Sequence, residues 1–269
     1  MTTEEEKRRQ EFYKKTMNRL DGMQQQLEEN PEDEMKLFRY AKGMVNTITI
    51  FGMSGDPKGI EMILDRFRKL VQEYGEIEEI QNQFSTALAN AMSYLMKKQK
   101  FKVMYDRLEE LRIFAREHPF NMSCQRSLAG GLVNAIINFG QREKIDEIEK
   151  LINELIVLAN AHREVVEIQL ALAKGLVNAV GYLSKFGNYE KAKSLLDELF
   201  ALTDEFPHHE DFILQRANGI VTAITNFSKV ENYQALVDKL NKELDRMATI
   251  YPNHEGVQLR AKMRTLGRD

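Results

Sequence analysis

The stretch AKGLVNAVGYL, which runs from Ala173 to Leu183, is one of five related segments spaced 44 residues apart. A fixed period of this length is the sequence signature of a helical repeat protein, because each unit leaves an apolar face that only its neighbours can cover. The other four copies are AKGMVNTITIF from Ala41, AGGLVNAIINF from Ala129, ANGIVTAITNF from Ala217 and ALANAMSYL from Ala87, whose leading alanine sits two places later in the motif.

Composition narrows the class of protein and its partners. Of the 269 residues, 43% are hydrophobic and 29% charged, and the net charge of −3 creates no strong field for nucleic acid or an acidic membrane. The single cysteine, Cys124, favours a reducing compartment. The N-terminal MTTEEEKRRQEF does not resemble a secretory signal, and no apolar run approaches the roughly 18 residues of a membrane helix. We therefore expect a cytoplasmic protein.

The fourth unit shows how one repeat is built. A largely apolar stretch from Glu164 predicts a long helix that Gly187 ends, and Asn188 is expected to cap the helix that follows. Pro207 then marks the turn into the next unit. The second helix carries one apolar stripe at i, i+3, i+4 and i+7 spacing, formed by Ala192, Leu195, Leu196 and Leu199.

Extending this pattern along the chain predicts an all-α protein of about 12 helices. We expect one domain over 1–269, folded as a right-handed α-solenoid of stacked antiparallel helix pairs. The first helix of each pair is called the A helix and the second the B helix. The A helices are expected near 32–52, 76–98, 120–141, 164–186, 208–229 and 253–266, and the B helices near 3–29, 56–74, 100–117, 143–161, 188–205 and 231–250.

Small residues recur at one position of the A helices. Glycine inside a helix costs about 1 kcal/mol relative to alanine, so its repeated use requires a compensating gain. We infer that it allows A helices to approach their neighbours closely. The position is held by Gly43, Ala87, Gly131, Gly175 and Gly219.

A polar stripe crosses every A helix, because positions three or four apart share a helical face. Asparagine amides can pair with an extended peptide backbone, so the stripe predicts a peptide-binding groove. They can equally bond a neighbouring helix and fix its stacking register. The amide row is Asn46, Asn90, Asn134, Asn178 and Thr222; the Tyr/Asn row, one turn on, includes Tyr94, Asn138, Tyr182 and Asn226; Lys42 and Lys174 flank them.

One unit carries a family resemblance. The run from Gly187 through Tyr189 to Ala192, followed by Pro207, resembles the tetratricopeptide repeat, with helices elongated to a 44-residue period. The resemblance implies a protein-binding concave face with rows of asparagine. It also draws attention to Lys-x-x-x-Asn, a spacing with which some members hold a carboxylate. Lys42 with Asn46 and Lys174 with Asn178 have this spacing, but they are three repeats apart.

No motif for catalysis, a cofactor or a metal stands out. Four of the five histidines lie near the turns before A helices, one per repeat and too far apart to share a metal ion, and no phosphate-binding loop or nucleophile elbow is present. We expect a non-enzymatic scaffold that binds a protein or peptide segment, with no cofactor and no membrane partner. A structural or self-assembling repeat protein is the alternative, with Phe12, Tyr13 and Met17 as candidate contacts, and homo-oligomers are compatible with either. RNA binding is a weaker third reading, since the net charge opposes it.

Overall fold

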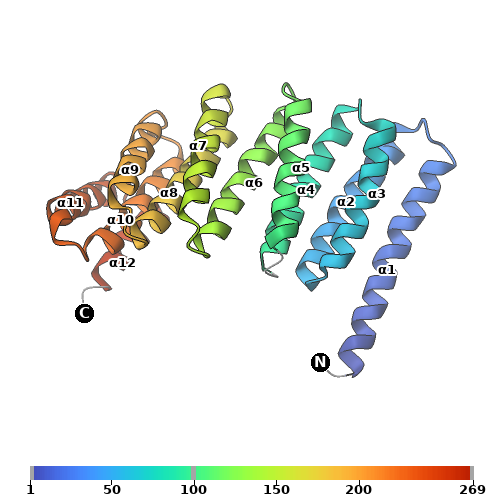
Figure 1. Ribbon diagram of the computed structural model, residues 1–269, viewed down its shortest axis with the longest axis horizontal. Helices are drawn as coiled ribbons and strands as arrows, with labels where there is room; N and C mark the ends of the chain where they lie inside the picture. Colours follow the sequence, from blue (N-terminus) through green and yellow to red (C-terminus); the bar gives the residue numbers. More distant parts are fainter. Residues whose placement is uncertain (1–2, 98–100, 267–269) are drawn as a thin grey trace. The chain divides into compact units, whose positions relative to one another are not determined.

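The described residues of the computed structural model, 3–97 and 101–266, form twelve α-helices, one short 3-10 helix and no strand (Figure 1). The all-helical prediction is therefore confirmed. The A helices are α2 (Glu34–Ser54), α4 (Glu78–Lys97), α6 (Met122–Gly140), α8 (Val166–Lys185), α10 (Glu210–Phe227) and α12 (Glu255–Leu266). The B helices are α1 (Thr3–Glu28), α3 (Pro57–Tyr74), α5 (Phe101–Glu117), α7 (Ile145–Ala161), α9 (Tyr189–Asp204) and α11 (Gln234–Ile250), the last preceded by η1 (Glu231–Tyr233).

Helix ends follow the chemistry of their terminal residues, with one correction. Gly187 has φ +86° after α8, a left-handed conformation that stops the helix without a side-chain penalty. Asp56 caps α3, since its side chain accepts a hydrogen bond from the Gly59 amide at 3.0 Å. Asn188 stands at the N-cap of α9 but makes no side-chain capping bond; it donates to Glu149 Oε1 at 2.7 Å instead. The expected capping bond of Asn188 is therefore wrong: its side-chain oxygen accepts no amide hydrogen bond at the start of α9, and its Nδ2 group links it to α7 instead.

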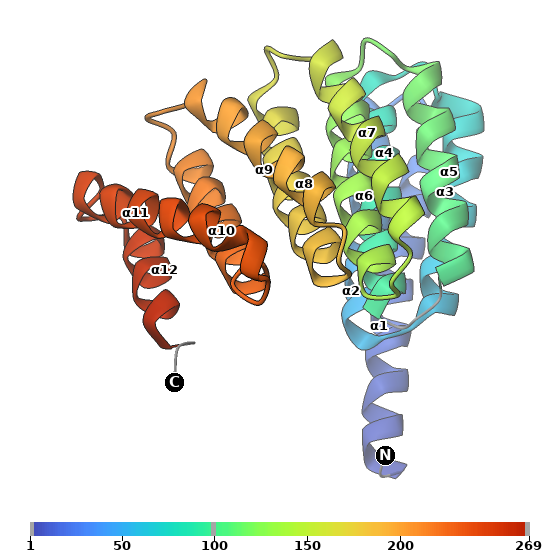
Figure 2. The same ribbon diagram turned by 60° about the vertical axis from the view of Figure 1, so that its left-hand side comes forward.

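The chain divides into two compact units, 1–131 and 132–269, with the boundary inside α6. In the first unit α2 packs against α4, and α3 contacts both of them. In the second, α8 packs against α10 and α10 against α12, while α9 contacts both α8 and α10. Figure 2 shows the antiparallel hairpins within each unit. A continuous single domain over 1–269 stays a prediction.

The recurring glycines admit leucine side chains from the preceding B helix. A Cβ built on Gly175 would lie 2.5 Å from Leu155, and one on Gly219 would lie 2.3 Å from Leu199. These contacts confirm the close approach that the small residues predict. The two B-helix leucines are also 44 residues apart, so the large side chain recurs with the same period as the glycine that it contacts.

A recurring glutamine closes the turn between a B helix and the next A helix. Gln169 Nε2 donates to the carbonyls of Ala159 at 2.8 Å and His162 at 3.1 Å, both at the end of α7. Helix C-termini leave carbonyls without an intrahelical donor, and a buried carbonyl without a partner is costly. The same arrangement occurs at Gln125 and Gln258, and Gln81 donates to the carbonyl of Gly75.

Among the residues that the structure describes, no helix combines the length and apolar character needed to cross a membrane.

Candidate binding surface on the A helices

The Tyr/Asn row packs against the preceding A helix of its own unit. A Cβ on Gly52 would lie 2.1 Å from the Tyr94 ring, and one on Gly140 would lie 2.1 Å from the Tyr182 ring, so each tyrosine lies directly over a glycine. Burial raises the pKa of the Tyr182 hydroxyl above its ordinary value. Asn226 Nδ2 donates to the carbonyl of Gly181 at 3.3 Å. Tyr94, Tyr182 and Asn226 of this row are therefore engaged in contacts with a neighbouring A helix.

Asn138 differs from its neighbours in this row. Its side chain is only 1% exposed, and neither amide atom has a hydrogen-bond partner within the described residues. It occupies the same place in the repeat as Asn226, whose amide bonds the backbone of an adjacent helix. A buried amide at 1% exposure offers nothing to a ligand on the surface, so we do not place Asn138 in the binding surface.

The amide row is more accessible. Asn46 is exposed and Asn90 half-buried, and neither makes a side-chain hydrogen bond within the described residues. Asn178 donates to the carbonyl of Lys174 in its own helix at 2.8 Å, which leaves its amide oxygen available. Asn134 and Thr222 are half-buried, and the Thr222 methyl group lies beside Gly181 on α8.

The predicted residues fall into two groups that follow the two units. The first unit brings together Lys42, Asn46, Asn90 and Tyr94 on the adjacent helices α2 and α4. Lys42 Nζ lies 5.6 Å from the centre of the Phe38 ring, and Lys174 is exposed. The second unit holds Asn134, Asn138, Lys174, Asn178, Tyr182, Thr222 and Asn226.

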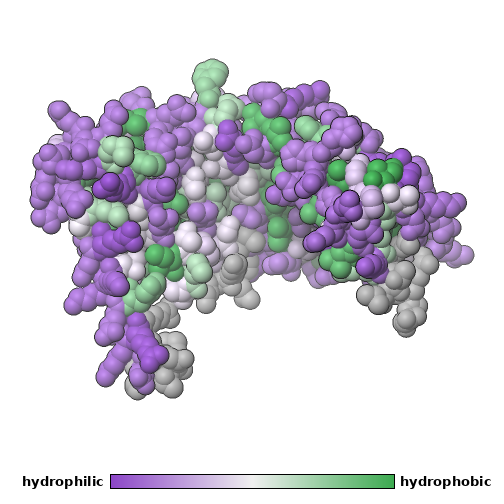
Figure 3. Space-filling model, turned by 180° about the vertical axis from the view of Figure 1, so that it is seen from behind, coloured by the Kyte–Doolittle hydropathy of each residue, from purple (hydrophilic) through white to green (hydrophobic). Residues whose placement is uncertain are grey.

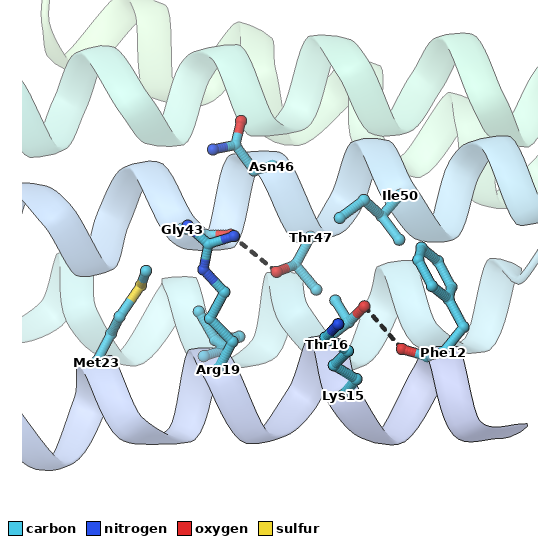
Figure 4. A pocket seen from close by; sticks show the side chains of 10 residues that line it. Phe12, Lys15, Thr16, Arg19, Met23, Gly43, Asn46, Thr47 and Ile50 are labelled. Carbon is cyan, nitrogen blue, oxygen red and sulfur yellow. Dashed lines mark hydrogen bonds between the residues drawn. The ribbon is translucent and has the colours of Figure 1, made fainter.

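A groove of about 250 Å³ lies between α1 and α2, within the first unit. Figure 4 shows Phe12 and Met23 at its two ends, with Lys15, Thr16 and Arg19 of α1 between them. The opposite wall, from α2, is formed by Gly43, Asn46, Thr47 and Ile50. Sequence reasoning singled out Asn46 and Phe12 but did not bring them together, since nothing in the repeat pattern shows which surfaces stay uncovered.

The groove combines an apolar floor with two cationic side chains. Leu20 is 1% exposed at its base, whereas Phe12 is 52% exposed at its end. Lys15 and Arg19 are exposed, and within the described residues neither forms an ion pair. Elsewhere on the surface, Figure 3 shows hydrophobic atoms in small separate areas among hydrophilic ones on the face it presents.

The described titratable side chains include a buried thiol and several ion pairs. In the part of the chain that the structure describes, no cluster of three or more His, Cys, Asp or Glu is placed to hold a metal ion. Cys124 is buried, and burial raises the pKa of its thiol to about 11. A network of ion pairs links α3 to α5. Arg68 of α3 lies 2.7 Å from Glu110 of α5, and Arg107 lies 2.6 Å from the same carboxylate.

No protein-family model, curated protein or solved structure matches this chain.

Proposed function

We propose that the protein is a non-enzymatic scaffold that binds a peptide or protein segment across its A helices. The observation that carries the proposal is the pair Asn46 and Asn90, at equivalent places on the packed helices α2 and α4. Both amides reach solvent and make no hydrogen bond within the described residues, while the row beside them is engaged in packing. A side-chain amide supplies donors and an acceptor, which is what a peptide backbone requires.

The arrangement of the whole chain is part of the same proposal. The period of 44 residues continues through the unit boundary in α6, which supports one right-handed solenoid of tetratricopeptide-like, elongated repeats. Two residues that carry the resemblance are engaged in packing, since Ala192 is buried and the Tyr189 ring lies 5.8 Å from the Phe227 ring. The single, buried cysteine supports a cytoplasmic location.

The test is a selection of peptides from a random library displayed on phage, with the purified protein as bait. Affinities of the selected peptides are then measured by isothermal titration calorimetry for the wild type and for the Asn46→Ala/Asn90→Ala variant. Each lost amide–backbone bond is worth about 1 kcal/mol, so the double variant should bind roughly 10- to 100-fold more weakly.

The matched control is Asn153→Ala, which removes an exposed helical asparagine on α7. It should leave the affinity unchanged, and circular dichroism should show that all variants keep their helix content. Selected peptides that bind the double variant as tightly as the wild type would show that the amide row is not the binding surface.

A further inference from the structure

The α2 wall of the groove consists of positions that, in other repeats, contact the preceding A helix. Tyr94 on α4 lies over Gly52 of α2, and Asn226 on α10 bonds the Gly181 carbonyl of α8. Ile50 of the groove occupies the same place in its repeat as these two residues. Gly43 follows the same rule, since a Cβ on its equivalent Gly175 would lie 3.6 Å from Ile136 of the preceding A helix, α6.

The α1 wall corresponds to a surface that is fully covered on α3. The residues 44 positions after Thr16, Arg19, Leu20 and Met23 are at most 2% exposed, because α3 lies against both α2 and α4. On α1 the same face packs on α2, and Arg19 remains exposed. The covered equivalents on α3 are Ile60, Ile63, Leu64 and Phe67.

Both walls of the groove therefore have the shape that receives an A helix ahead of α2, and no helix within the described residues lies there. The α1 wall also carries charge that the covered face of α3 lacks. Lys15 and Arg19 stand four residues apart on one face of α1, where α3 has Gly59 and Ile63. Two exposed cations beside an apolar floor favour a partner with carboxylates along an apolar stripe.

We propose that this groove binds an amphipathic helix of another protein, with acidic side chains flanking its apolar face. The partner helix takes the place of an A helix before α2, with its apolar stripe over Leu20, Thr47 and Ile50. Its carboxylates pair with Lys15 and Arg19. A second copy of this chain is disfavoured as the source, because its last A helix, α12, carries Arg260 and Lys262 and would bring like charges together.

The experiment uses two fluorescein-labelled synthetic helical peptides of about 20 residues, which is close to the length of a natural A helix. They share one leucine stripe, and its flanking positions are glutamate in one peptide and lysine in the other. Fluorescence anisotropy is measured with the wild type, with Lys15→Glu/Arg19→Glu, and with the control Lys239→Glu/Lys242→Glu. The control makes the same change of charge on exposed residues of α11.

The wild type should prefer the glutamate peptide by about tenfold or more, and Lys15→Glu/Arg19→Glu should reverse the preference. The control variant should behave as the wild type. Equal binding of both peptides, or a preference that survives the charge reversal, overturns the proposal. So does a dimer seen by sedimentation that Lys15→Glu/Arg19→Glu dissociates, because the occupant would then be a second copy.

The groove shares Asn46 with the amide row, so one further variant is needed to separate the two proposals. Asn90 does not line the groove. Asn90→Ala should therefore leave binding of the glutamate peptide unchanged, even where it weakens binding of library-selected peptides. A loss of glutamate-peptide binding in Asn90→Ala would contradict the groove as the site.

Discussion

The ring of Tyr182 lies directly over Gly140 of the preceding A helix, so close that a Cβ on Gly140 would come within 2.1 Å of the ring. Tyr94 and Gly52 repeat the relationship in the other unit. In both cases the tyrosine follows its glycine by 42 residues. The sequence places tyrosine in this row where the preceding A helix offers a glycine, and Asn226, which has Ser184 at that distance, forms a backbone hydrogen bond instead.

The first prediction is that Gly140→Ala destabilises the protein. The added methyl group forces the Tyr182 ring to move, and overpacking of this kind costs about 1 to 3 kcal/mol, more than the roughly 1 kcal/mol gained in helix propensity. Urea unfolding followed by circular dichroism measures the change. Gly130→Ala is the matched control in the same helix, because nothing lies within 4 Å of its Cβ position, and it should stabilise the protein. Gly140→Ala that is as stabilising as Gly130→Ala would contradict the contact.

The second prediction concerns the glutamine that closes the turn after each of several B helices. Gln169→Ala should lower the free energy of unfolding by about 2 to 3 kcal/mol, because two carbonyls lose their shared donor in a buried site. Gln72→Ala, which changes an exposed residue of α3, should alter it by less than about 0.5 kcal/mol. If chemical denaturation gives similar values for the two variants, the hydrogen bonds of Gln169 contribute no net stability.

The third prediction is that Cys124 is unreactive in the folded protein. Its side chain is 0% exposed, and burial raises the pKa of its thiol to about 11, so little thiolate forms at pH 8. Labelling with a thiol-specific chromogenic disulfide should be slow in buffer and rapid in concentrated urea. Rapid labelling without denaturant would show that α6 opens far more readily than its packing indicates.

The fourth prediction is a dependence of stability on pH that comes from Glu243. Its hydrogen bond with Arg246, together with the nearby Arg216, holds the pKa of its carboxyl below the ordinary value. A folded-state pKa below the unfolded one stabilises the protein at neutral pH, and this contribution is lost as pH falls through the folded-state value. Glu243→Gln should therefore be less stable than the wild type by about 1 to 2 kcal/mol at pH 7, and the difference should shrink near pH 3.

Urea unfolding at both pH values provides the measurement for Glu243→Gln. Glu198→Gln is its control, since Glu198 is an exposed carboxylate of α9. A destabilisation by Glu243→Gln that is the same at both pH values would show that the charge of Glu243 is not its source.

Helix number and boundaries could be predicted because they depend on local chemistry. Apolar periodicity, the glycine stop at Gly187 and the Asp56–Pro57 start act within a few residues, and the observed helices begin and end within about two residues of the expected positions, apart from η1 before α11. The capping bond expected of Asn188 was wrong, and only the folded chain shows that its Nδ2 group donates to Glu149, 39 residues earlier, while its side-chain oxygen makes no capping bond.

The turn-closing glutamines carried a signal that could have revealed them, as Gln81, Gln125 and Gln169 recur with the same period as the asparagines. In the next repeat Ile213 replaces glutamine, and Arg216 bonds the Phe200 carbonyl and Thr203 Oγ1 at the end of α9. In that repeat the end of the B helix is bonded from a position three residues later, which a strict 44-residue period does not show.

The sequence by itself determined an all-helical repeat, its period and the complementary small and large residues of its core, because these follow from spacing along the chain. Only the tertiary structure decided which polar side chains are exposed to solvent. Asn46 and Asn138 are both asparagines of the polar stripe, yet Asn46 is exposed and Asn138 is only 1% exposed. Exposure depends on what neighbouring helices cover, and for α1 and α2 that leaves open the groove holding Lys15 and Arg19.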